Sequence, residues 1–194
     1  MTTEPASEMR VKAGSKVDIT CTAEGNPQPR YEWIQRGTDK ISDYQHLVIE
    51  KVGYSQQGEY ICTAINTIGG KDRSVRSEVV RLDVTGVPQA LTRSGDMIGV
   101  VGEDVSIEGV YCSDPAPIRT TWEWDGTVLP TGSDISGRFR AESVPHPSME
   151  ECYISSLVVS GVEKEDAMTY SLHVENSFGQ DQVLLALHVE GIHC

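Results

Sequence analysis

Apolar and polar residues alternate in short runs along this chain, and the period of an α-helix is almost absent. Residues 17–21 alternate in this way, and so do Tyr31, Glu32 and Trp33 in the next run. Clusters rich in Gly, Pro and Asn separate the runs, as in residues 24–29. A period of two places alternate side chains on one face of a β-strand. The pattern therefore predicts an all-β sandwich of short strands joined by turns.

The same order of runs occurs twice, with a repeat of roughly 90 to 100 residues. The first copy contains the runs 17–21, 31–34, 47–49, 60–64 and 77–84. The second copy contains the runs 105–107, 121–124, 157–159, 170–174 and 183–189. We therefore expect two domains of one fold, residues 1–86 and 87–194, joined by a short linker that restricts bending.

Composition excludes several classes of protein. Hydrophobic residues make up 38% of the 194 residues, and the chain also contains 18 glycines. This apolar content is usual for a globular chain and too high for a disordered one. The longest charge-free apolar run, residues 182–189, is far shorter than the ~20 residues that cross a bilayer. The first nine residues lack the cationic start and apolar block of a signal peptide, so we expect an intracellular protein or a piece of a longer one.

The net charge of −13 is unevenly placed. Residues 1–86 hold 11 Lys and Arg against 12 Asp and Glu, whereas residues 87–194 hold 5 against 17. Nucleic acids and anionic membranes bind cationic surfaces, so the acidic balance argues against both as partners. Carboxylates repel across a self-contact, so the first domain is the better candidate for a direct protein contact, and we expect the fragment to be monomeric.

Cys21, Trp33 and Cys62 form the most specific pattern in the sequence. Trp33 follows Cys21 by 12 residues, and Tyr60 precedes Cys62 by two. This set resembles the immunoglobulin fold, in which two cysteines bridge the facing sheets, the indole packs on the bridge and a tyrosine closes a corner. The resemblance implies a Cys21–Cys62 disulfide. The short span from Trp33 to Leu47 resembles the compact I-set or C2 type.

The second copy departs from this pattern. The motif EDAMTYSL (165–172) resembles the Glu-Asp-Ala-Gly-x-Tyr-x-Cys motif of the family, with Tyr170 as the corner residue and Leu172 in place of the second cysteine. Gly109, 13 residues before the core candidate Trp122, stands in place of the first. The usual inter-sheet disulfide cannot form here, and we expect Leu172 to fill the space opposite Gly109 by packing alone.

Cys112 and Cys152 provide a different pair. Aligned on the family pattern, Gly109 lies opposite Ser155, and paired residue numbers in an antiparallel ladder have a constant sum, here 264. Cys112 and Cys152 have the same sum, which predicts a disulfide between neighbouring strands. The alternative is two free thiols near the end of the sheet. Cys194, the odd cysteine, is then free or paired with another chain.

Further motifs resemble the irre cell-recognition family (Roughest, Kin-of-irre, Kirrel and their nephrin-type partners). Echinoid-like receptors are an alternative family that these motifs resemble almost as closely. The second domain resembles the membrane-proximal immunoglobulin domain of that family through the span from Gly109 to Trp122 and through TWEW (121–124), GRFRAES (137–143) and VENSFGQD (174–181). NPQPRYEWIQ (26–35) is similar to the preceding domain.

This resemblance implies an ectodomain piece of a single-pass adhesion receptor on the extracellular side of the plasma membrane. The partner would be another receptor of the immunoglobulin superfamily, in homophilic or heterophilic contact. In that family the outermost domain usually makes the recognition contact, so inner domains are mainly spacers.

No pattern of catalytic residues stands out. The sequence has no nucleophile elbow, phosphate loop or zinc-spaced cysteine set, so we expect neither an enzyme nor a cofactor or metal site. Tyr31, Tyr44 and Tyr54 are candidates for a protein-contact face, because tyrosine suits interfaces. Isolated surface tyrosines are the alternative.

A second function fits the same fold. Tandem I-set domains also form load-bearing links in intracellular sarcomeric and cytoskeletal proteins. The cysteines discriminate between the two hypotheses, because a reducing cytosol keeps thiols free.

Overall fold

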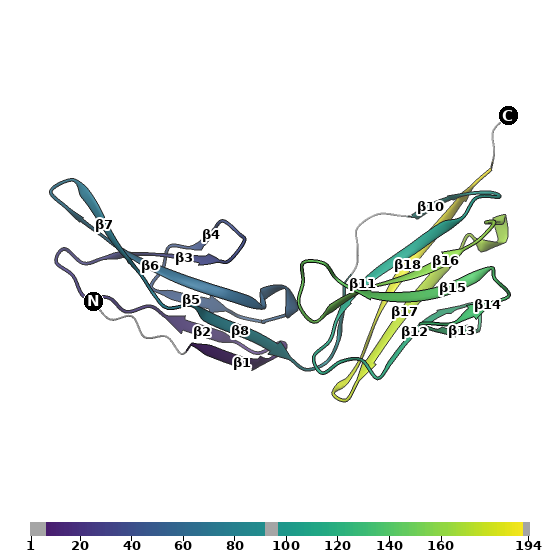
Figure 1. Ribbon diagram of the computed structural model, residues 1–194, viewed down its shortest axis with the longest axis horizontal. Helices are drawn as coiled ribbons and strands as arrows, with labels where there is room; N and C mark the ends of the chain where they lie inside the picture. Colours follow the sequence, from purple (N-terminus) through teal and green to yellow (C-terminus); the bar gives the residue numbers. More distant parts are fainter. Residues whose placement is uncertain (1–6, 92–96, 192–194) are drawn as a thin grey trace. The chain divides into compact units, whose positions relative to one another are not determined.

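The computed structural model describes residues 7–91 and 97–191. Almost every regular element is a β-strand, so the prediction of an all-β fold is confirmed. The chain divides into two compact units, and the division falls between Thr85 and Gly86 (Figure 1). The expected boundary lay one residue later, and Gly86 belongs to the second unit.

The first unit is a sandwich of a large sheet and a small one. Its elements are β1 (Glu8–Lys12), β2 (Val17–Thr20), β3 (Arg30–Gln35), β4 (Lys40–Ser42), β5 (His46–Ile49), the 3₁₀ turn η1 (Tyr54–Gln56), β6 (Gly58–Ile68), β7 (Lys71–Arg76) and β8 (Val80–Thr85). The large sheet has the order β1-β8-β6-β3-β4, with β7 also paired to β6. The small sheet contains only β2 and β5 among the described residues.

The core of the first unit lies between these sheets. In β2, Val17 and Ile19 are buried while Asp18 and Thr20 are exposed, as the alternation along the strand requires. Trp33 on β3 lies opposite Cys62 on β6, and both are fully buried. The hydrophobic alternation of the sequence therefore places the indole at the centre of the sandwich.

The second unit contains two five-stranded sheets among the described residues. Its elements are β9 (Gln89–Leu91), β10 (Met97–Val100), β11 (Val105–Cys112), β12 (Arg119–Trp124), β13 (Thr127–Pro130), β14 (Asp134–Ile135), β15 (Phe139–Pro145), β16 (Cys152–Val159), the 3₁₀ turn η2 (Lys164–Asp166), β17 (Thr169–Asn176) and β18 (Gly179–Glu190). One sheet has the order β10-β18-β17-β12-β13 and the other β14-β15-β16-β11-β9.

Gly109 and Leu172 replace the inter-sheet cysteines by packing. Both lie in the core, Gly109 on β11 and Leu172 on β17 in the facing sheet. A Cβ atom added to Gly109 would lie 2.6 Å from Leu172 Cδ2, far inside van der Waals contact. The leucine side chain therefore occupies the space that a side chain at position 109 would need.

This packing predicts that Gly109→Ala lowers the free energy of unfolding of the second unit by about 1–3 kcal/mol, because a fully buried leucine must leave its position. Urea denaturation measures the change. In the double variant with Leu172→Val, the smaller side chain leaves room for the new methyl group, so the two losses should be less than additive. Strict additivity would show that the two positions do not share this space.

Candidate interaction surface

Two disulfides stabilise the two units in different ways. Cys21 directly follows β2 and is bonded to Cys62 on β6, so this bridge joins the two sheets of the first unit, with a Cα–Cα distance of 6.3 Å. Cys112 is bonded to Cys152 between the neighbouring strands β11 and β16. In that ladder Gly109 pairs with Ser155 and Cys112 pairs with Cys152. The second bridge therefore lies within one sheet. Cys194 lies outside the described residues.

Trp122 occupies the core of the second unit and has a polar partner there. Its Nε1 donates a hydrogen bond to Ser155 Oγ at 3.0 Å, and Ser155 Oγ donates to the carbonyl oxygen of Glu142 at 3.1 Å. Trp33 Nε1 has no hydrogen-bond partner among the described residues. Trp33 and Trp122 are therefore alike in burial and different in hydrogen bonding.

Tyr60 and Tyr170 form equivalent corners. The hydroxyl of Tyr60 donates to the carbonyl oxygen of Gln56, and that of Tyr170 donates to the carbonyl oxygen of Asp166 at 3.0 Å. Burial raises the pKa of each phenol to about 12, because the charged phenolate would lose its hydration. Each tyrosine therefore ties the turn before a strand to that strand.

The raised pKa values predict the pH dependence of stability. The folded state holds each phenol proton more tightly than the unfolded chain does, whose tyrosines ionise near pH 10. The stabilisation of the fold by these protonated phenols is therefore fully present below pH 10. It is lost as the pH rises toward about 12. Burial also raises the pKa of Tyr153, so absorbance titration of phenolate should show at least two late-ionising tyrosines, and Tyr60→Phe and Tyr170→Phe should each remove one. Ionisation of all tyrosines near pH 10 in folded protein would contradict this assignment.

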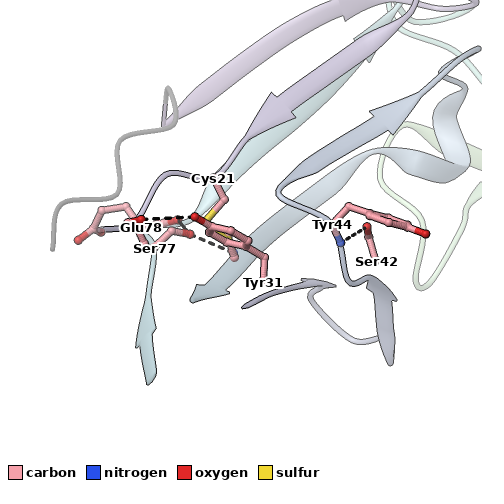
Figure 2. The surroundings of a disulfide bond; sticks show 8 residues. Cys21, Tyr31, Ser42, Tyr44, Ser77 and Glu78 are labelled. Atoms are coloured by element: carbon pink, nitrogen blue, oxygen red, sulfur yellow. Dashed lines mark hydrogen bonds between the residues drawn. A yellow bond between two sulfur atoms is a disulfide. The ribbon is translucent and has the colours of Figure 1, made fainter. Parts of the chain in front are cut away.

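The three tyrosines expected to form a contact face do not share one. Tyr31 and Tyr54 are only 7% and 4% exposed, whereas Tyr44 is 77% exposed. Tyr31 lies two residues from Trp33 on β3 and therefore points into the same core, and Tyr54 is buried in the turn η1. Figure 2 shows Tyr44 next to Ser42 and away from Cys21 and Tyr31. The backbone N–H of Tyr44 donates a hydrogen bond to Ser42 Oγ. The expectation of a face built from Tyr31, Tyr44 and Tyr54 is therefore wrong.

Tyr44 belongs to a different surface, at an edge of the first unit. A hollow with a volume of ≈ 560 Å³ lies between β4 and β5 and is lined by Ile41, Ser42 and residues 44–48. Ile41 and Val48, 42% and 43% exposed, flank it together with Tyr44. Three exposed apolar side chains in one hollow mark a candidate contact surface.

The outer face of β12, β17 and β18 in the second unit has a different character. Glu123 Oε2 lies 3.4 Å from His173 Nε2, and His173 Nε2 lies 2.8 Å from Ser171 Oγ. Val128 and Leu184 are exposed on either side of these polar groups. Polar groups that already bind one another occupy the middle of this face, so it is the less apolar of the two surfaces.

Two asparagines were missed by the sequence reasoning. Asn176 Nδ2 donates to the carbonyl oxygens of Gly86 at 2.7 Å and Pro115 at 3.3 Å, and Asn66 Nδ2 donates to that of Pro27 at 2.7 Å. Each asparagine lies four residues after the second cysteine position of its copy and binds the proline-containing turn that precedes the tryptophan strand. Their matching positions in the repeat were the available signal.

The described residues contain no cluster of three or more His, Cys, Asp or Glu side chains that could hold a metal ion. In the same residues, no helix has both the length and the hydropathy to cross a membrane.

Comparisons with known proteins agree with this architecture. A family model described as "Immunoglobulin domain" matches residues 1–66. Among solved structures, the complex of Dpr2 Ig1-Ig2 with DIP-Theta Ig1-Ig3 and the titin Ig tandem A164-A165 each align with a TM-score of 0.53 over 95% of this chain, covering 62% and 93% of their own chains. Their identities of 22% and 20% establish the fold alone. The protein is a tandem of immunoglobulin-like domains.

Sequence relatives narrow the class. Human Kin of IRRE-like protein 3 is 32% identical over 98% of this chain and 23% of its own length. Human Kin of IRRE-like protein 2 is 28% identical over 91% of this chain and 25% of its length. Human myelin-associated glycoprotein is 29% identical over 96% of this chain and 27% of its length. The resemblance to the irre cell-recognition family is confirmed. The chain spans about a quarter of the length of these relatives.

Proposed function

We propose that this chain is a stretch of the extracellular part of a cell-surface adhesion receptor, in which the two units serve as protein-binding and spacer modules in cell–cell recognition. The carrying observation is the similarity to Kin of IRRE-like proteins, which extends across both units. The partner is another receptor of the immunoglobulin superfamily, and the chain carries out no catalysis.

The disulfides favour this proposal over the intracellular one. Cys21–Cys62 and Cys112–Cys152 close loops in both units, and such bonds persist in oxidising compartments and not in the cytosol. In a reducing cytosol the facing pair Cys112 and Cys152 would have no structural purpose. The likeness to the titin tandem supports the alternative function only through the shared fold.

Antibody staining of intact cells tests the proposed location. Antibodies raised against the folded chain should label unpermeabilised cells that express the native protein, with enrichment where two cells touch. A second antibody against a cytosolic protein is the control for membrane integrity. Staining that requires permeabilisation and follows sarcomeric or cytoskeletal filaments would overturn the proposal and favour the intracellular alternative.

A further inference from the structure

The outer edge of β5 presents backbone groups that no other strand of the described residues pairs. Within residues 7–91 and 97–191, β5 is hydrogen-bonded to β2 along one edge and to no strand along the other. The ladder pairs Ile19 with Leu47 and Val17 with Ile49. The backbone N–H of Cys21 donates to the carbonyl of Gln45 in the same register. Backbone groups of successive residues point to opposite sides of a strand. Those of residues 45, 47 and 49 therefore face β2, and those of His46 and Val48 face outward.

This edge lacks the charged side chains, prolines and bulges that usually prevent pairing, although the strand is short. The neighbouring edge strand β4 begins with Lys40 and pairs with β3 through a register shift at Trp33 and Ile34. The exposed strand β7, KDRSVR, carries four charged side chains. Lysines, other charges and bulges protect sheet edges from other chains. β5, with the sequence HLVI, contains no lysine, carboxylate or proline.

The sequence around β5 is complementary to itself. An antiparallel pairing of two copies centred on Val48 would place Val48 opposite Val48 and His46 opposite Glu50 of the second copy. Residues 46, 48 and 50 are all exposed, and their outward backbone groups match those that such a pairing bonds. A contact on a two-fold axis requires this kind of self-complementarity.

Charge and apolar surface are also compatible with a second copy. The register sets His46 opposite Glu50 of the second copy, so the two Glu50 carboxylates do not face each other. Within its own copy, His46 Nδ1 lies 3.0 Å from Asp18 Oδ1 and Glu50 Oε1 lies 2.9 Å from Lys16 Nζ. Residues 1–86 are nearly neutral, with 11 cationic and 12 anionic side chains. The hollow flanked by Ile41 and Tyr44 runs beside the same edge and offers apolar area to cover.

We propose that the outer edge of β5 pairs with the same edge of a second copy of this chain, antiparallel and centred on Val48. The pairing extends the two-stranded sheet β2-β5 into a four-stranded sheet shared by two copies. A four-residue strand buries little area, so the contact is weak and forms where the local concentration of copies is high. It depends on the fold of the first unit and not on the adhesion role, so the failure of either proposal leaves the other standing.

Cysteine cross-linking of the two-unit chain tests the pairing. In a Cys194→Ser background, a mixture of His46→Cys and Glu50→Cys chains should form mixed dimers in preference to either homodimer. Val48→Cys alone should cross-link at least about tenfold faster than the matched control Val128→Cys, an exposed valine on β13 of the second unit, because pairing raises the effective concentration of the thiols.

A blocking variant tests the edge itself. Val48→Lys places a charge on the two-fold axis and leaves the β2–β5 hydrogen bonds in place, so mixed dimers should disappear while the unfolding midpoint stays near that of the wild type. Val128→Lys should leave cross-linking unchanged. Equal rates for Val48→Cys and Val128→Cys would overturn the pairing of two copies, and a preference for His46→Cys homodimers would overturn the register.

Discussion

Replacing Trp33 or Trp122 by alanine is expected to lower the free energy of unfolding of its own unit by roughly 3–5 kcal/mol. Both indoles are fully buried at the centre of their sandwiches. A domain of this size has about 5–15 kcal/mol of stability in total, so either loss leaves the unit close to unfolding. Urea denaturation followed by circular dichroism gives the free energies, and each variant should affect the transition of one unit.

Phenylalanine variants separate packing from hydrogen bonding. Trp122→Phe removes the donor to Ser155 Oγ, whereas Trp33→Phe removes an N–H without a partner among the described residues. Trp122→Phe should therefore cost about 0.5–1.5 kcal/mol more than Trp33→Phe. If either alanine variant melts at the temperature of the wild type, the assignment of that tryptophan to the core is incorrect.

The second large effect is expected from removing the disulfides. The bonded cysteines are 41 residues apart in the first unit and 40 in the second. In the chain-entropy model, a loop of this length contributes about 3–4 kcal/mol by restricting the unfolded chain. Replacing Cys21 and Cys62 by alanine should destabilise the first unit by this amount, and replacing Cys112 and Cys152 should do the same in the second.

Chemical reduction of the wild type provides the comparison for these variants. The reductant should lower the midpoints of both units in the wild type and of only one unit in each double-alanine variant. Cys194→Ser is the control and should change neither midpoint. Midpoints that do not respond to the reductant would contradict the contribution of the disulfides to stability.

The register of the second unit could be predicted because a single constraint determines it. An antiparallel ladder has one constant sum of residue numbers, so aligning Gly109 with Ser155 also places Cys112 opposite Cys152, and the structure joins these two cysteines. The loss of the inter-sheet cysteines was likewise visible in the sequence, because Gly109 and Leu172 occupy positions that the repeat defines.

The contact surface could not be predicted in the same way. Tyr31 was expected at the surface although its spacing from Trp33 places it on the core face, and Tyr54 is buried by a 3₁₀ turn that no hydrophobic period reveals. The open edge of β5 arises because only three residues separate β4 from β5. The short span from Trp33 to Leu47 is visible in the sequence, but which strand edge it leaves open depends on the three-dimensional pairing.

The hydrogen bonds of Asn66, Asn176 and Ser155 were also beyond the sequence pattern. Each joins elements that are distant along the chain, and polar side chains in a strand sequence do not show which partner they reach. Comparing the two copies position by position would have identified the asparagines.

A thiol count on the native protein tests the central claim, that these units are the disulfide-bonded domains of an extracellular receptor. The protein is isolated from the cells that make it, with thiols alkylated during lysis, and the mass of the proteolytic fragments from this region is measured before and after reduction. The account predicts that Cys21, Cys62, Cys112 and Cys152 are alkylated only after reduction, with the peptides joined as Cys21–Cys62 and Cys112–Cys152. Alkylation of all four before reduction would contradict it and place these domains in a reducing compartment.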